Sequence, residues 1–119
     1  MRMIDMHMHV KGAGTEWSWD HNDRIIEAAD ALGIEQLVVS IPVVRGMPDY
    51  ARVRQCNDAV IDCMRQYEGR IQGWCYVIAG QKQSLDEIDR CLDAGMVGIK
   101  LYNQYKIWDP AVQPVLEKA

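Results

Sequence analysis

Two histidines near the N-terminus are the residues best suited to chemistry. They lie in residues 4–10, where apolar and polar residues alternate strictly, and Asp5, His7 and His9 share the polar side. This alternation predicts a β-strand, because successive side chains of a strand leave on opposite faces. The two imidazoles would then lie about 7 Å apart along one face. Neutral imidazole binds zinc and related divalent metals, so the pair predicts two ligands of one metal ion.

The same alternation also describes a strand with one solvated face, on which two histidines need no metal. The position of the pair favours the metal site, because His7 and His9 end the first strand of a repeating strand–helix pattern. In α/β folds, binding and catalytic groups lie at the carboxyl ends of the strands. Trp17 and Trp19 follow the pair and would form either an apolar wall over a site or a cover over the end of the core.

The length and composition predict one small globular domain. The chain has 119 residues, of which 49% are hydrophobic and 25% charged, an ordinary globular balance. The net charge of -4 provides no basic surface for nucleic acid. No segment is apolar for long enough to cross a membrane, and the first strand starts too early for a signal peptide. We therefore expect a cytoplasmic protein with no membrane or nucleic-acid partner.

After the first strand, the hydrophobic periodicity predicts a helix and then three further strand–helix units. The expected elements are a helix from Asp20 or Asn22 to Leu32, a strand over 37–41, a helix from Asp49 to Glu68, a strand over 70–79, a helix starting at Ser84, a strand over 96–102 and a helix from Asp109 to the chain end. Nearly continuous apolar runs are typical of parallel strands that are covered on both faces. The order βαβαβαβα predicts an α/β fold with right-handed crossovers between parallel strands.

Helix ends and buried faces follow from the same pattern. Gly33 and Gly69 are expected to end helices, and Ser84 with Glu87 three residues later predicts a capping box. The expected buried faces of the helices comprise Ile25, Ile26, Ala29, Leu32, Val53, Cys56, Val60, Cys63, Met64, Tyr67, Ile88, Cys91 and Leu92. The four cysteines, at positions 56, 63, 75 and 91, lack the spacing of a metal site or a redox motif, and we expect them to be reduced and buried.

At residues 4–9 together with residues 98–102, the sequence resembles the metal-dependent hydrolases of the amidohydrolase superfamily. It is most similar to the amidohydrolase-related branch that also contains aminocarboxymuconate-semialdehyde decarboxylase-like enzymes. Residues 54–58, 67–73 and 85–98 resemble the same branch, so the resemblance covers nearly the whole chain. The His-x-His motif also occurs in TatD-type nucleases and PHP phosphoesterases, but the strand that carries the lysine argues against these.

The resemblance implies a (β/α)8 TIM barrel whose catalytic divalent metal, usually zinc, would be bound here by His7 and His9. In binuclear members a carboxylated lysine on the fourth strand bridges two metals, which makes Lys100 the candidate catalytic residue. Lys100 would alternatively contact an anionic substrate, or bury its stem and reach solvent. Asp5 would orient the histidines by hydrogen bonding or make a plain buried polar contact. His21 matches nothing in the family pattern and is expected at the surface or at a helix cap.

The chain would be the first half of such a barrel. A TIM barrel takes about 250 residues, whereas residues 1–119 would form a single domain of four strand–helix units. The strand-five histidine and the strand-eight aspartate, which takes the proton of the attacking water in the family, have no counterpart in this sequence. Two explanations follow. The chain is an apparently truncated product, or two copies close one barrel through their open strand edges and form a homo-oligomer.

For function, the resemblance implies a metal-dependent hydrolase acting on a small-molecule substrate. Metal-activated water would attack a carbonyl group, or the same metal would serve a decarboxylation. The alternatives are a non-catalytic α/β assembly or binding module and a TatD-like or PHP-like phosphoesterase. Stoichiometric zinc that is lost when His7 or His9 is replaced by alanine would favour the hydrolase over the non-catalytic module.

Overall fold

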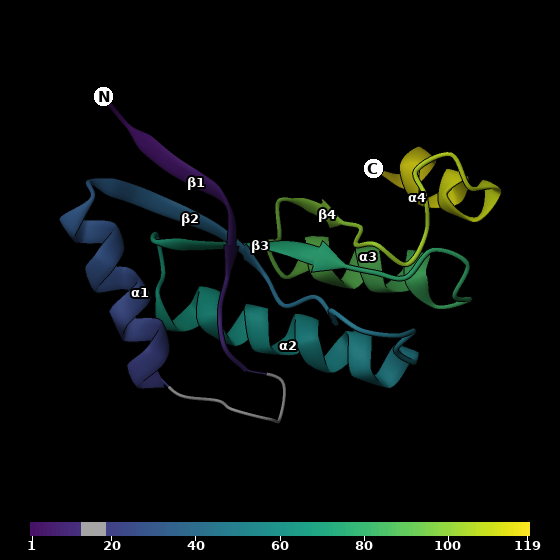
Figure 1. Ribbon diagram of the computed structural model, residues 1–119, viewed down its shortest axis with the longest axis horizontal. Helices are drawn as coiled ribbons and strands as arrows, with labels where there is room; N and C mark the ends of the chain where they lie inside the picture. The colour runs from purple at the N-terminus through teal and green to yellow at the C-terminus, as the bar shows by residue number, and fades with distance from the viewer. Residues whose placement is uncertain (13–18) are drawn as a thin grey trace.

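The computed structural model describes residues 1–12 and 19–119, with Trp19 described by its backbone alone. Trp17 and the side chain of Trp19, expected to form either an apolar wall over a site or a cover over the end of the core, lie outside the described part. The elements in chain order are β1 (Met3–His9), α1 (Trp19–Ala31), β2 (Ile34–Ser40), α2 (Tyr50–Gln66), β3 (Ile71–Tyr76), α3 (Ser84–Asp93), β4 (Gly98–Lys100), the 3-10 turn η1 (Pro110–Val112) and α4 (Gln113–Lys118) (Figure 1).

The strands form one parallel sheet in the order β1-β2-β3-β4. Each strand therefore pairs with the next one along the chain, and a helix makes each connection. The last residues of β1 and β2, His9 and Ser40, are directly opposite each other in the sheet. The last residues of β3 and β4, Tyr76 and Lys100, are also opposite each other. The expected βαβαβαβα order and parallel sheet are confirmed.

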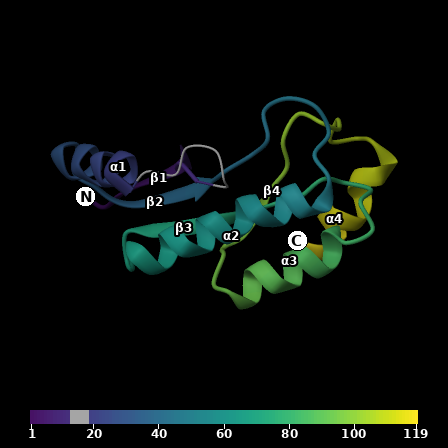
Figure 2. The same ribbon diagram turned by 90° about the horizontal axis from the view of Figure 1, so that it is seen from below.

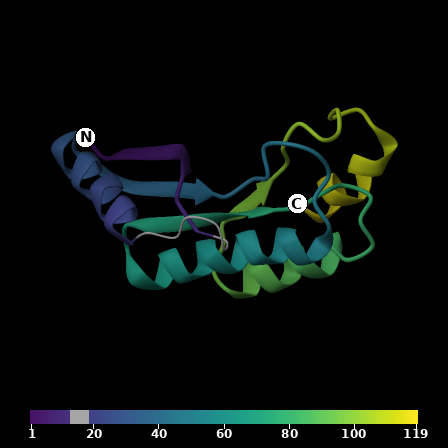
Figure 3. The ribbon, with the colours of Figure 1, turned by 60° about the horizontal axis from the view of Figure 1, so that its bottom comes forward.

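The core lies between the sheet and the helices that follow its strands. Figures 2 and 3 show α2 and α3 side by side along β3, with α1 beside β1 and β2. The sheet and helices approach closely at Gly73, where a Cβ atom would lie 2.7 Å from the Val60 side chain. Fully buried residues of the core include Val39, Val60, Cys63, Cys75, Val77, Ile88 and Cys91. All four cysteines are buried and unpaired, as expected.

Several helix ends follow the sequence signals. The Asp49 carboxylate accepts a hydrogen bond from the Arg52 backbone N–H at 2.8 Å and caps α2. Asp109 caps the last helical segment in the same way through Ala111. Gly33 ends α1 with a φ of 70°, a conformation that other residues rarely adopt. Within the described residues, no helix is long and apolar enough to cross a membrane.

Four expectations about the helices are wrong. Leu92, expected on the buried face of α3, is 40% exposed. Leu32 is 66% exposed because α1 ends at Ala31, one residue before it. Helix α1 begins at Trp19, so neither Asp20 nor Asn22 is its cap. The capping box of Ser84 and Glu87 does not form, because the Ser84 hydroxyl donates to the Ile78 carbonyl at 2.6 Å and α3 has no side-chain cap.

Two expected strands are shorter in the structure than in the sequence pattern. β3 ends at Tyr76 rather than at residue 79, and β4 spans Gly98–Lys100 rather than residues 96–102. Residues 77–79 are buried, so their apolar character reflects packing beyond the hydrogen-bonded ladder. The apolar stretch of sequence is therefore longer than the hydrogen-bonded strand, because the buried residues continue after strand pairing has stopped.

Candidate metal centre

The candidate site residues gather where the parallel strands end. His9 is the last residue of β1, Ser40 of β2, Tyr76 of β3 and Lys100 of β4. His7 lies two residues before the end of β1, on the same side of the strand as His9. Because the carboxyl ends of parallel strands meet at one edge of the sheet, groups from β1 and β4 come within reach of each other there.

The two histidines lie next to each other. Their ring centroids are 5.2 Å apart, and the ring planes are nearly perpendicular at 87°. His9 Nδ1 lies 3.0 Å from the Ser40 carbonyl oxygen and 3.4 Å from the Ser40 hydroxyl. Since a carbonyl oxygen only accepts, Nδ1 carries the proton, and in the neutral ring Nε2 keeps a free lone pair. A backbone carbonyl that orients an imidazole in this way is the usual partner of a metal-binding histidine.

Lys100 reaches across the sheet to the histidine pair. Its Nζ lies 3.1 Å from His7 Nε2, although the two residues are 93 positions apart in sequence. A lysine ammonium has donors only, so His7 Nε2 accepts this hydrogen bond. The structure therefore brings together His7, His9 and Lys100, the three site residues that the sequence predicts, and it places the cationic end of Lys100 beside the nitrogen that would face a metal.

Trp74 supports the β1 side of this site. Its indole N–H donates to the Met6 carbonyl at 3.0 Å, next to His7 in the chain. The ring lies over Gly98, where an added Cβ would be 2.5 Å from the Trp74 ring atom Cζ3. β4 thus carries a glycine where the tryptophan crosses it, and β1 is fixed relative to β3 by a side chain.

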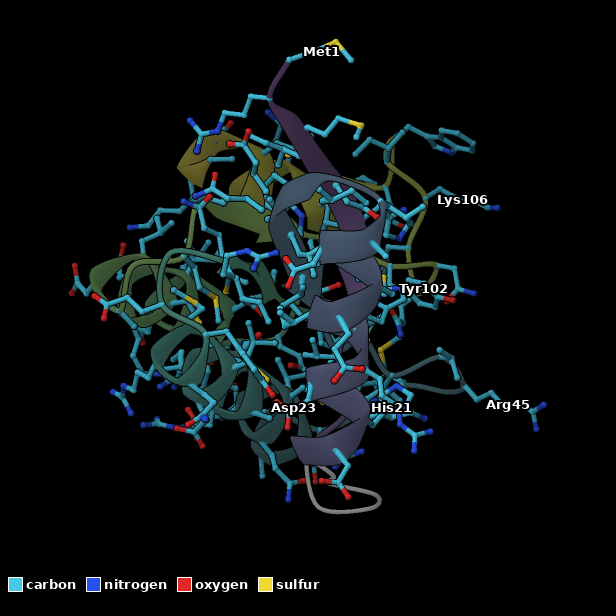
Figure 4. All side chains as sticks on the ribbon, turned by 90° about the vertical axis from the view of Figure 1, so that its left-hand side faces the viewer. Met1, His21, Asp23, Arg45, Tyr102 and Lys106 are labelled. Atoms are coloured by element: carbon cyan, nitrogen blue, oxygen red, sulfur yellow. The ribbon has the colours of Figure 1, made fainter. Side chains whose placement is uncertain are left out.

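Asp5 and His21 take no direct part in the arrangement that the structure shows. Asp5 Oδ1 accepts a hydrogen bond from the backbone N–H of His7 at 2.9 Å, a contact within the strand. It orients the backbone that carries His7, which fits the hydrogen-bonding alternative more closely than a buried polar contact. His21 is exposed on α1 (Figure 4), as expected for a surface residue.

The residues present fit part of a divalent metal site. Two imidazoles, one of them oriented by a carbonyl, are a suitable start, but a catalytic zinc site normally has three protein ligands. No group of three or more His, Cys, Asp or Glu side chains within the described residues could hold a metal ion. Water or other groups would have to complete the coordination, so the donor set predicts weak binding.

Comparisons with solved structures identify the fold. A 5-carboxyvanillate decarboxylase from Novosphingobium aromaticivorans, with bound manganese, aligns over 98% of this chain and 47% of its own, with 16% identity and a TM-score of 0.75. A 2,6-dihydroxybenzoate decarboxylase from Rhizobium aligns over 99% and 46%, with 19% identity and a TM-score of 0.68. A probable 2-pyrone-4,6-dicarboxylic acid hydrolase from Acinetobacter baumannii, with citric acid bound, aligns over 99% and 45%, with 21% identity and a TM-score of 0.65.

The chain has the fold of the first half of a (β/α)8 barrel, as in these structures. The expected half of a (β/α)8 barrel is thereby confirmed at the level of the fold. The chain spans less than half the length of these structures. No family model and no curated protein matches the sequence. The expectation of zinc is not supported by the neighbours, one of which contains manganese.

Two pockets open near the carboxyl ends of the strands. The first, of about 370 Å³, adjoins His9 and is lined by Val10, Lys11, Gly12, Ile41, Pro42, Val44 and Arg52. The second, of about 130 Å³, is mainly apolar and lies beyond β3 and β4, with Tyr102, Gln104, Tyr105 and Val112 among its lining residues.

Sequence reasoning missed three residues that shape this half-barrel. Ser40 orients His9, Trp74 fixes β1, and Asn22 exchanges two hydrogen bonds with the Lys11 backbone at 3.0 and 3.1 Å. The sequence shows only the residue types at these positions. Ser40 and Asn22 are fully buried polar residues, and buried polar residues need hydrogen-bond partners, but the sequence does not show which side chains are buried.

Proposed function

We propose that this chain is the metal-binding half of a metal-dependent hydrolase or decarboxylase that acts on a small molecule with a carbonyl group. The observation that carries the proposal is the cluster of His7, His9 and Lys100 at the carboxyl ends of β1 and β4. This is the end of the strands at which βα barrels place their active sites. The structural neighbours, which are hydrolases and decarboxylases, support the same reaction class.

The residues of the cluster would have separate roles. His7 and His9 would hold a divalent metal, with His9 kept in the correct tautomer by the Ser40 carbonyl. A bound metal supplies an acidified water molecule and polarises a carbonyl oxygen. Lys100, half-buried at the end of β4, would place its ammonium group against an anionic substrate or against the negative charge that develops on that oxygen.

The pocket beside His9 and the ligands of the structural neighbours indicate the class of substrate. Lys11 and Arg52 line this pocket together with His9. The structural neighbours bind carboxylic acids, namely citric acid, 3-methoxy-4-hydroxy-5-nitrobenzoic acid and 2,6-dihydroxybenzoate. We therefore propose that the substrate is a small carboxylic acid.

Metal binding by the purified chain tests the proposal. Titration calorimetry with Mn²⁺ and with Zn²⁺ should detect one weak site, and His7→Ala or His9→Ala should lower the affinity at least tenfold. The matched control is His21→Ala, an exposed histidine on α1 that should leave the affinity unchanged. Binding that is insensitive to His7→Ala and His9→Ala, or no binding by a folded chain, would contradict the metal site and favour a non-catalytic α/β module.

A further inference from the structure

The register of β1 against β2 changes within the strand. Asp5 is opposite Leu37 and Met8 is opposite Val39, so three steps along β1 match two steps along β2. β1 therefore contains one additional residue between Asp5 and Met8, which is the pattern of a β-bulge. The strict alternation that the sequence predicts for this strand is interrupted here.

This bulge decides which face of the sheet carries the two histidines. In the register that Asp5 sets, His7 would be opposite Val39. In the same register His9 would be opposite Ile41, and both of these partners pack in the hydrophobic core. A shift of one residue turns the following side chains of a strand to the other face. The additional residue therefore turns His7 and His9 away from the core.

On the face where the bulge places them, the histidines meet the other residues of the site. His9 is opposite Ser40, and its Nδ1 lies 3.0 Å from the Ser40 carbonyl oxygen. His7 Nε2 lies 3.1 Å from Lys100 Nζ, and the two imidazole ring centroids are 5.2 Å apart. The cluster of His7, His9 and Lys100 therefore depends on the additional residue in β1.

Two side chains bond the peptide unit at the centre of the bulge. The His7 backbone N–H donates to Asp5 Oδ1 at 2.9 Å, and the Met6 carbonyl accepts from the Trp74 indole N–H at 3.0 Å. A bulge leaves backbone groups without partners in the ladder, and such groups need other partners. The Met6 carbonyl and the His7 N–H belong to one planar peptide unit, so bonds at both of its ends fix the orientation of the plane. The direction in which the His7 side chain leaves the strand follows from that orientation.

We propose that Asp5 and Trp74 are positioning residues of the candidate metal centre, because together they hold the bulge that turns His7 towards Lys100. Asp5 acts from within β1, whereas Trp74 reaches the strand from β3, on the far side of β2. The role requires an acceptor at position 5 and a donor at position 74, and it does not require the charge of Asp5. The effect on metal binding rests on the proposed function, whereas the effect on the position of His7 does not.

Nuclear magnetic resonance of the metal-free chain tests the positioning of His7. Nuclear Overhauser cross-peaks should connect the His7 ring with the His9 ring and with the Lys100 side chain. Asp5→Ala should remove these cross-peaks, whereas Asp5→Asn keeps a carbonyl acceptor and should retain them. Trp74→Phe keeps an aromatic ring without the N–H and should also remove them. Full cross-peaks in Asp5→Ala or in Trp74→Phe, or their loss in Asp5→Asn, would overturn the positioning role.

Calorimetric titration of the same variants with Mn²⁺ tests the consequence for metal binding. Asp5→Ala and Trp74→Phe should lower the affinity about tenfold or more, as for other residues that orient metal ligands, and Asp5→Asn should restore it. The matched control is Asp86→Ala, which removes an exposed carboxylate in the first turn of α3 and should change neither the cross-peaks nor the affinity. Full affinity in Asp5→Ala would contradict the role of Asp5 in the metal centre. A chain that shows the cross-peaks but binds no Mn²⁺ would contradict the proposed function and support the positioning of His7 alone.

Discussion

Asn57 on α2 takes the place of a missing neighbouring strand at Tyr76 on β3. The pairing of β2 with β3 ends at Val39 and Gly73, three residues before Tyr76. The Asn57 amide then donates to the Tyr76 carbonyl at 2.9 Å and accepts from the Tyr76 N–H at 2.9 Å. One side chain therefore satisfies both backbone groups on the side from which β2 has departed. This contact lets the β2 and β3 ends separate without leaving buried backbone groups unpaired.

Replacing Asn57 by alanine should destabilise the fold strongly. The change leaves the Tyr76 N–H and carbonyl without partners in the core, and each unsatisfied buried group costs about 1–3 kcal/mol. We expect the free energy of unfolding in urea to fall by about 2–4 kcal/mol. Gln66→Ala, an exposed position on the same helix, is the control and should change it by less than about 0.5 kcal/mol. Equal effects of the two substitutions would contradict the role of Asn57.

Glu87 should make stability depend on pH. This carboxylate is 1% exposed and accepts hydrogen bonds from Asn57 at 2.9 Å and from Arg90 at 2.7 and 2.9 Å. Burial acts to raise the pKa of Glu87, but the hydrogen bonds from Arg90, Asn57 and Tyr50 and the Arg90 charge outweigh it, so the pKa is lowered. A carboxylate with a lowered folded-state pKa stabilises the fold above its unfolded-state pKa.

The stability that Glu87 contributes should therefore be present at neutral pH and be lost as the pH falls below the usual glutamate pKa of 4.5 and through the lowered folded value. Urea midpoints at pH 7, 5, 4 and 3 measure this loss. The Glu87→Gln variant has no carboxylate to protonate at this position, so its urea midpoint should fall less with decreasing pH. The difference in urea midpoint between the unmodified chain and the variant should therefore shrink as the pH falls. A difference that stays constant or widens would show that Glu87 is not the group responsible.

The sequence predicts the architecture well because strand and helix periodicity, glycine stops and the Asp49 cap are local signals. Alternation also places His7 and His9 on one side of the first strand and Lys100 on a definite side of the fourth strand, and the structure brings the three together. The role of Lys100 in a site comes from the family resemblance, and the roles of all three residues stay predictions. It does not predict the network of Asn57, Glu87, Arg90 and Tyr76, whose members lie on three elements. Glu87 has a capping-box spacing from Ser84, yet its carboxylate turns to Asn57, since the tertiary contact satisfies a buried amide and the cap would not.

Gly98 and Trp74 should be energetically coupled. A Cβ at position 98 would lie 2.5 Å from the Trp74 ring, so Gly98→Ala must displace the indole and weaken its hydrogen bond to Met6. We expect the free energy of unfolding to fall by about 1–3 kcal/mol, the usual cost of inserting a methyl group where there is no room for it. In a Trp74→Leu background the same substitution should have much less effect, because the obstructing ring is absent. Chemical unfolding of all four proteins gives the coupling energy, and additive losses would refute the contact.

Lys100 should weaken metal binding in this half-barrel while its amine remains unmodified. Its Nζ lies 3.1 Å from His7 Nε2, so a metal at that nitrogen must displace a cation and then remain near it. Two unit charges 4 Å apart interact by about 1 kcal/mol even in water, so Lys100→Met should raise the affinity for Mn²⁺ or Zn²⁺ about fivefold or more. Lys106→Met, which changes an exposed lysine in the loop after β4 (Figure 4), should leave the affinity unchanged.

Calorimetry with and without bicarbonate tests the other role of Lys100, that of a carboxylated metal ligand. A carboxylated lysine would act as a ligand, and Lys100→Met would then lower the affinity in bicarbonate, contrary to this prediction.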